Sequence, residues 1–233
     1  MRYTFTMFNF HFGKKREKVV AILDVGSNSV AAAIVALQGD KQAKVLVSRR
    51  QLLSFEKREP RATVHAIIML MRDTLSQVAQ EYAKSVGART IDECHAIFHT
   101  PWVRSRSIVA TTHFNKPTRI TNEIINTLAQ DAIQTKVGID YAVLFESIVI
   151  RVALDGYYTN IPIGKTTSRI DVTCLLSDGD VNILKATREK LQTMCASTPN
   201  VHSSIRSVYT AMRKVSPELL DYLIVDIAGN ETC

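Results

Sequence analysis

A short polar segment between two apolar runs has residue types that could bind phosphate. Residues 24–29 read Asp-Val-Gly-Ser-Asn-Ser, and apolar runs flank them at 19–23 and 30–37, which predicts a β-hairpin with this segment as its turn. Gly26 permits a tight turn. The small polar residues that leave backbone N–H groups open to an anion are Ser27, Asn28 and Ser29. The segment suits phosphate oxygens, with Asp24 ordering Mg²⁺ through water, although the same residues also occur in ordinary hairpin turns.

A second segment of the same kind lies near the end of the sequence. Asp226 follows the apolar run 223–225, and small residues continue through Gly229 to Thr232. Two such loops, about 200 residues apart, are more specific than either alone. They match the paired phosphate loops of the actin-like ATPase fold, so we predict that Asp226, Gly229 and Thr232 bind the same ligand as the hairpin.

The hydrophobic pattern predicts a mixed α/β protein. Three consecutive antiparallel strands are followed by a long helix with an apolar face from Val64 to Tyr82, and later by a unit that reads strand, helix, strand, strand. The remaining predicted strands are 94–98, 105–113, 141–154, 167–177 and 222–227, and the remaining predicted helices are centred on 124–133, 181–194 and 203–214.

Several motifs resemble the N-terminal part of the FtsA family of bacterial cell-division proteins, which are actin homologues. The segments that carry this resemblance are Val19–Leu37, Glu93–His113 with Arg119–Lys136, Leu154-Asp155-Gly156, Ile161-Pro162-Ile163-Gly164, Arg169-Ile170-Asp171-Val172 and Val225-Asp226-Ile227. The resemblance implies an actin-like ATPase domain of the ribonuclease H-like type, with an inserted strand-helix-strand-strand subdomain. The match ends inside the second phosphate loop, so we expect a truncated product or a partial gene.

The resemblance also implies a division of the chain. The expected parts are a flexible aromatic and basic tail at 1–18, a first part of actin-like domain I at 19–87, the inserted subdomain at 88–177, return helices of domain I at 178–220 and the start of domain II at 221–233. Four residues depart from the family pattern and weaken the expected nucleotide site. These are Ser29, where many members carry Lys, and Ala228, Asn230 and Glu231, where the family has Gly, Gly and Thr.

The function implied by the resemblance is a nucleotide-associated scaffold that self-assembles through its inserted subdomain and links the division ring to the membrane. ATP and Mg²⁺ are the implied cofactors, and a division-ring or other assembly protein is the implied partner. Two alternatives share the fold: an exopolyphosphatase-like hydrolase, which residues 24–30 also resemble, and a pilus-assembly relative. The strand-helix-strand-strand reading of 93–177, with no catalytic Glu in a matching context, favours a weakly ATP-binding scaffold over a dedicated enzyme.

Charge and composition exclude several other classes. The 233 residues are 46% hydrophobic and 22% charged with a net charge of +7, which is typical of a globular protein. Five of the basic residues lie in 1–18 against one acidic residue, so the rest is too weakly basic to indicate nucleic acid. The tail is aromatic before it is basic, the reverse of a signal peptide. We expect a cytoplasmic protein, with a weak contact of the tail at the inner face of the cell membrane as a further hypothesis.

Two further motifs resemble a metal site and a P-loop, but each lacks a feature that such a site requires. His95 and His99 have an i, i+4 spacing, but the residues between them predict a strand and no second ligand pair follows. Gly164-Lys165-Thr166 resembles the end of a P-loop, yet Thr159 stands where that motif requires its first glycine. The sequence therefore indicates ordinary histidines and no P-loop.

Overall fold

The computed structural model describes residues 17–39, 42–54, 59–86, 90–135, 143–216 and 223. The chain divides into two compact units. The first contains the residues up to Val103 and from Gly179 onward, and the second spans Arg104–Asp178. Each unit contains its own β-sheet, so the predicted mixed α/β class is confirmed.

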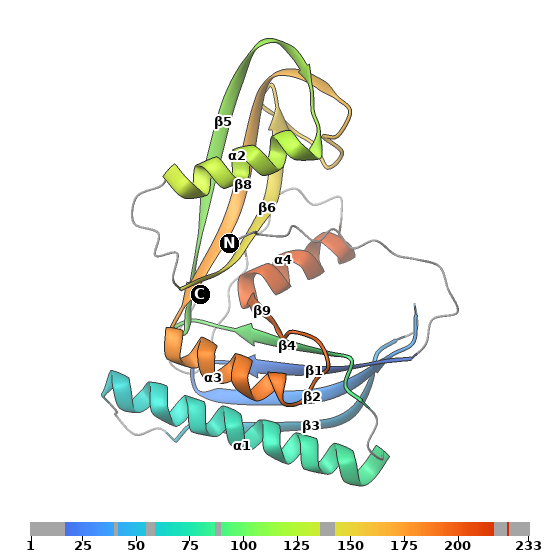
Figure 1. The fold of residues 1–233 in the computed structure, drawn as a ribbon, viewed down its shortest axis with the longest axis vertical. Coiled ribbons are helices and arrows are strands. Elements are labelled where there is room, and N and C mark those ends of the chain that lie inside the picture. The colour runs from blue at the N-terminus through green and yellow to red at the C-terminus, as the bar shows by residue number, and fades with distance from the viewer. Residues whose placement is uncertain are drawn as a thin grey trace. The chain divides into compact units, whose positions relative to one another are not determined.

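The first unit is a five-stranded sheet with helices (Figure 1). Its elements are β1 (Lys18–Val25), β2 (Ser29–Leu37), β3 (Lys44–Leu52), α1 (Pro60–Val86), β4 (Glu93–Phe98), α3 (Val181–Gln192), β9 (Asn200–Ser203) and α4 (Ser204–Val215). The strand order is β3-β2-β1-β4-β9. Strands β1, β2 and β3 pair antiparallel, as the sequence predicted, whereas β4 is parallel to β1 and β9 is parallel to β4.

This topology follows from the lengths of the connections. Short turns can join only antiparallel neighbours, whereas a parallel neighbour needs a crossover long enough to return the chain to the same end of the sheet. Helix α1 provides that crossover between β3 and β4. The carboxyl ends of β1, β4 and β9 therefore lie at one edge of the sheet, which is where open α/β sheets bind ligands.

The core of the first unit lies between the sheet and the helices α1 and α3. Alternate residues of β1 and β2 are buried toward these helices, among them Leu23 and Ile34, each with 0% exposure. The predicted apolar face of α1 is confirmed by its buried residues, which are Ile67, Met71, Leu75, Val78 and Tyr82. On β4, Cys94 points to this side because its thiol donates to the carbonyl of Leu191 in α3. Helix α4 contacts β4 and β9.

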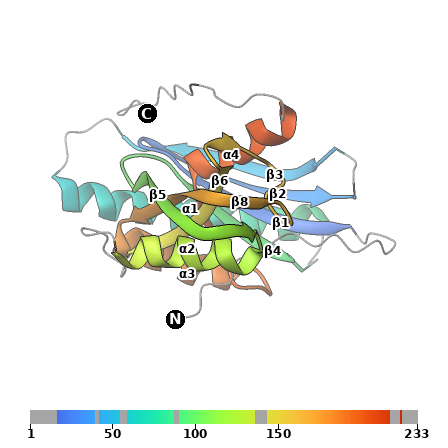
Figure 2. The same ribbon diagram turned by 90° about the horizontal axis from the view of Figure 1, so that it is seen from above.

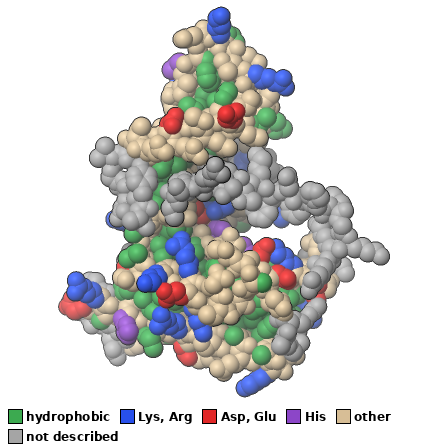
Figure 3. Space-filling view, in the orientation of Figure 1, with side chains coloured by type: hydrophobic (Ala, Val, Ile, Leu, Met, Phe, Trp, Pro, Cys, Tyr) green, Lys and Arg blue, Asp and Glu red, His purple; other side chains and the backbone are tan. Residues whose placement is uncertain are grey.

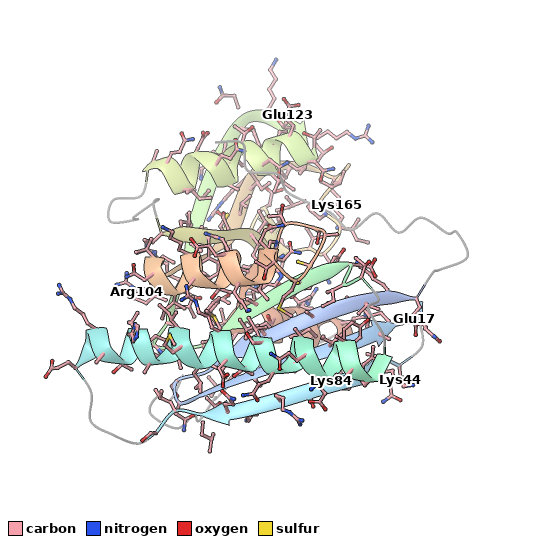
Figure 4. All side chains as sticks on the ribbon, turned by 60° about the horizontal axis from the view of Figure 1, so that its bottom comes forward. Glu17, Lys44, Lys84, Arg104, Glu123 and Lys165 are labelled. Carbon is pink, nitrogen blue, oxygen red and sulfur yellow. The ribbon has the colours of Figure 1, made fainter. Side chains whose placement is uncertain are left out.

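The opposite end of the first unit, away from the β1–β2 turn, is polar. Glu17, Lys44 and Lys84 lie there, at the beginnings of β1 and β3 and in the last turn of α1 (Figure 4). On the face shown in Figure 3, basic and acidic side chains are interspersed over the first unit.

The second unit contains β5 (Val103–Arg119), α2 (Asn122–Thr135), β6 (Leu144–Leu154), β7 (Tyr157–Tyr158) and β8 (Thr166–Gly179). The sheet order is β5-β8-β6-β7, and α2 lies along the sheet in both views (Figures 1 and 2). The buried residues of α2 lie at helical spacing within the predicted helix at 124–133, and they are Ile125, Ala129, Ala132 and Ile133. A two-residue turn of Asp155 and Gly156, both with positive φ, joins β6 to β7.

Three features differ from the sequence-based expectation. The second unit begins at Arg104, not at residue 88, because β4 pairs between β1 and β9 in the first sheet. Strand β9 was missed because its four residues are too short to show an alternating pattern. The predicted strand 222–227 lies outside the described residues, apart from Leu223.

Within the described part of the chain, no helix has the length and apolar character needed to cross a membrane. Residues 1–16 of the predicted tail lie outside the description.

Candidate phosphate-binding hairpin

The turn between β1 and β2 is tightly closed by backbone hydrogen bonds. The N–H of Gly26 donates to the carbonyl of Ser29 at 2.9 Å, and the N–H of Leu53 donates to the carbonyl of Asn28 at 2.7 Å. A Cβ atom on Gly26 would lie 3.3 Å from the Ser29 carbonyl oxygen, which is closer than most such contacts. Glycine at this position therefore allows the close approach that closes the turn.

A second turn, residues 99–102 after β4, holds the hairpin from the neighbouring strand. The indole N–H of Trp102 donates to the carbonyl of Gly26 at 2.6 Å, and the backbone N–H of His99 donates to the carbonyl of Val25 at 3.0 Å. Trp102 is 7% exposed. The sequence analysis missed this turn, although Trp102 is the only tryptophan in the chain and directly follows a proline, which was an available signal.

Asp24 lies at the end of β1 as predicted, and its carboxylate has a partner that the sequence did not indicate. Oδ1 of Asp24 is 2.7 Å from Nε2 of His99, and both side chains are about one-third exposed or less. His95, which shares the i, i+4 spacing, is about 13 Å away along an extended chain and contacts other groups. The two histidines therefore have different hydrogen-bond partners, Asp24 for His99 and Glu93 with His202 for His95.

A shallow hollow on the sheet surface adjoins Asp24. Its volume is about 400 Å³, and its lining residues include Ile22, Asp24, Ala31, Ala33, Ser48 and Arg50. The strand register places Asp24 opposite Ala31 and Ala31 opposite Arg50, so the small alanine separates an acidic and a basic side chain. Arg50 forms no ion pair with any described residue. The guanidinium group of Arg50 therefore brings positive charge to this hollow.

The hairpin fits phosphate with Mg²⁺ on two observations. The backbone N–H of Asn28 donates to no described residue, so it remains available to an anion. The carboxylate of Asp24 is 36% exposed and only Oδ1 contacts His99, which leaves Oδ2 for a metal-bound water. Phosphate oxygens would be bound by the Asn28 amide and by the hydroxyl of Ser29, which is half-buried. The hydroxyl of Ser27 is less accessible, since this residue is 3% exposed.

The other predicted site residues follow near the end of the sequence. Asp226, Gly229 and Thr232 lie outside the described residues, so the second phosphate loop stays a prediction. No group of three His, Cys, Asp or Glu side chains able to hold a metal occurs among the residues described. The P-loop decoy is a different structure, because the N–H of Gly164 donates to the carbonyl of Ile120 and strand β8 follows it.

Comparisons with known proteins give only distant similarities. No family model and no curated protein match the chain. Among solved structures, a chain of the PilM-PilN type IV pilus biogenesis complex is 9% identical, with a TM-score of 0.44, over 85% of this chain and 52% of that one. A Bacteroides thetaiotaomicron protein, described as having an actin-like ATPase fold and unknown function, is 7% identical, with a TM-score of 0.37, over 85% and 57%.

The PPX-GPPA enzyme of Aquifex aeolicus is 17% identical, with a TM-score of 0.27. That match covers 36% of this chain and 27% of the enzyme. The chain thus spans at most about 57% of the length of these three structures.

Proposed function

We propose that the chain is part of an actin-like assembly scaffold, related to FtsA, whose hairpin at 24–29 binds the phosphates of a nucleotide. The observation that supports this most is the sheet order β3-β2-β1-β4-β9, with Asp24 at the carboxyl edge of the parallel strands. A unit that reads strand, helix, strand, strand lies between β4 and α3, apart from the two-residue β7. This is the arrangement that the resemblance to FtsA implies for domain I and its inserted subdomain.

The second unit would be the surface for self-association or for a division-ring or other assembly protein. Four exposed apolar side chains in and after β7 support this proposal. They are Tyr157, Tyr158, Ile161 and Ile163, with exposures from 41% to 81%. Soluble proteins seldom leave several large apolar side chains exposed together unless they bind a partner.

Two alternatives remain proposals of the same rank. The Asp24–Ser29 hairpin equally supports an exopolyphosphatase-like hydrolase, which would cleave phosphoanhydride bonds. A pilus-assembly protein would use the same fold as a scaffold. Hydrolysis separates the first alternative from both scaffolds, because a scaffold needs to bind phosphate without rapid turnover.

Trp102 provides the test of phosphate binding. Its indole donates to the Gly26 carbonyl, so a ligand that shifts the hairpin should change the only tryptophan fluorescence of the chain. We expect a saturable change with Mg-ATP or with polyphosphate, and a weaker one in Asn28→Asp, which adds a carboxylate beside the phosphate. Asn122→Asp, at the first residue of α2, is the matched control.

Each result has a defined meaning. No fluorescence change with either ligand, or equal titrations for Asn28→Asp and the wild type, would refute the hairpin as a phosphate site. Phosphate release measured in the same samples separates the candidates: rapid release from polyphosphate supports the hydrolase, and binding without release supports a scaffold. Replacing Tyr157 and Ile161 by serine should then weaken concentration-dependent sedimentation if the second unit mediates assembly.

A further inference from the structure

Four side chains outside the hairpin form a continuous chain of polar contacts across β4, β9 and α4. Nε2 of His95 is 3.3 Å from Oε2 of Glu93, and Nδ1 of His95 is 3.1 Å from Nε2 of His202. Nδ1 of His202 is in turn 3.3 Å from Nη1 of Arg206, in the first turn of α4. These polar contacts thus connect β4 to β9 and to helix α4, which follows β9.

The contact between the two histidines has the geometry of a direct N–H···N hydrogen bond. The two rings are nearly parallel, at 19°, and their centroids are 5.4 Å apart. This separation exceeds the N···N distance by about the sum of two ring radii, so the two nitrogens lie near the line that joins the ring centres. The rings therefore meet edge to edge, and one proton between them completes the bond.

Arginine fixes which nitrogens carry the protons. A guanidinium group only donates, so Nδ1 of His202 must accept from Arg206 and its proton must be on Nε2. That proton is donated to Nδ1 of His95, which leaves the proton of His95 on Nε2, where it is donated to Glu93. Every contact then has one donor and one acceptor, and both histidines are neutral.

A proton added to either histidine disrupts the hydrogen bond between His202 and Arg206. If it binds His202, Nδ1 becomes a donor that faces Arg206. If it binds His95, the bond between the rings reverses, and the proton of His202 moves to Nδ1 with the same result. In both cases α4 loses its contact with His202 and two cationic groups face one another.

We propose that Glu93, His95, His202 and Arg206 form a proton-sensitive latch that holds β9 and the first turn of α4 against β4. The latch is closed when both histidines are neutral, and protonation of the pair releases Arg206 first and β9 second. The hydrogen bonds that form the latch join its four members to one another.

The charges around the pair agree with this direction. Burial lowers the pKa of His95, its hydrogen bond to Glu93 opposes that change, and nearby His202 and Lys18 lower the pKa further. Burial raises the pKa of Glu93, but hydrogen bonds from Lys18 and His95 outweigh it, so the pKa of this carboxyl is lowered and it stays ionised. Since the folded state disfavours the proton on His95, its contribution is present above pH 6.5 and is lost as the pH falls.

Hydrogen exchange of the full chain at pH 7.5 and pH 5.5 tests the latch. After correction for intrinsic exchange rates, the opening constant of peptides covering 200–215 should rise about tenfold at pH 5.5, because a released histidine with a pKa of about 6.5 is then mostly protonated. Peptides from α1 should show no such rise. Equal pH dependence in α1 and in 200–215 would overturn the proposal.

Variants separate titration from packing. His202→Gln keeps one donor and one acceptor but has no ring nitrogen that takes a second proton, so the pH step should become smaller, and the double variant His95→Gln with His202→Gln should lose it. His65→Gln, at an exposed position of α1, should keep the full step. Arg206→Gln should make the step smaller, because a protonated His202 no longer faces a cation. Circular dichroism at pH 7.5 checks that each variant folds. A full pH step in the double variant His95→Gln with His202→Gln, or an unchanged step in Arg206→Gln, would contradict the latch.

Discussion

Removing the two arginines that contact Asp178 should destabilise the second unit by more than the sum of the single changes. Nε of Arg104 and Nη2 of Arg106 donate to the two carboxylate oxygens of Asp178 at 3.0 and 3.1 Å. The Asp178 side chain is 6% exposed, whereas those of Arg104 and Arg106 are 83% and 41% exposed. Both arginines therefore reach the protein surface while their guanidinium groups pair with a buried carboxylate.

The magnitudes follow from these exposures. Arg104→Gln should cost only about 0.5 kcal/mol, because a mostly exposed cation contributes little, and Arg106→Gln about 1 kcal/mol. The double variant leaves a buried carboxylate with neither arginine and should cost about 3 kcal/mol, at the low end for breaking a buried pair. The excess of about 1.5 kcal/mol arises because either arginine alone partly compensates for the loss of the other.

The assay is urea unfolding followed by circular dichroism, with hydrogen exchange to localise the loss to β5 and β8. Arg119→Gln is the matched control, since Arg119 is exposed on the same strand and pairs with no described carboxylate. In an Asp178→Asn background, the double arginine change should cost less than about 1 kcal/mol, because no buried charge remains. Strictly additive single and double changes, or a double variant as stable as Arg119→Gln, would refute the reasoning.

Three further predictions concern other parts of the chain. Trp102→Phe removes the donor to the Gly26 carbonyl and should lower the free energy of unfolding by about 1 kcal/mol, with faster amide exchange in the hairpin. Unchanged amide exchange in the hairpin would contradict a stabilising role of this hydrogen bond. Burial raises the pKa of the Cys174 thiol to about 11 and raises the pKa of Cys94 further still, so neither should react with a thiol reagent at pH 8 before urea is added. The segment 1–18 should bind anionic vesicles weakly, because each basic residue near such a surface contributes about 1 kcal/mol, and this binding should be lost as salt rises. Equal co-sedimentation of the full chain and of a version beginning at residue 19 would contradict this prediction.

The sequence determined the elements whose evidence is local. The alternation of β1 and β2 around the polar turn predicts the hairpin, and the helical spacing of apolar residues predicts the buried face of α1. Both patterns reflect which side chains are buried, because one face of a strand repeats every two residues and one face of a helix repeats every three to four residues. Asp24 could be placed at the end of a strand for the same reason.

Only the tertiary structure decided which strands are neighbours. The pairing of β4 beside β1 brings His99 to Asp24, which is 75 positions away in the sequence. The same pairing brings Trp102 to Gly26, which is 76 positions away. The periodicity of apolar residues carries no information on which strand pairs with which, so the contacts of His99 and Trp102 with the hairpin could not be predicted. Burial patterns also could not show that β4 belongs to the first sheet, because a strand has the same alternation in either unit. The latch depends on the same register, since His95 and His202 meet only where β9 pairs with β4.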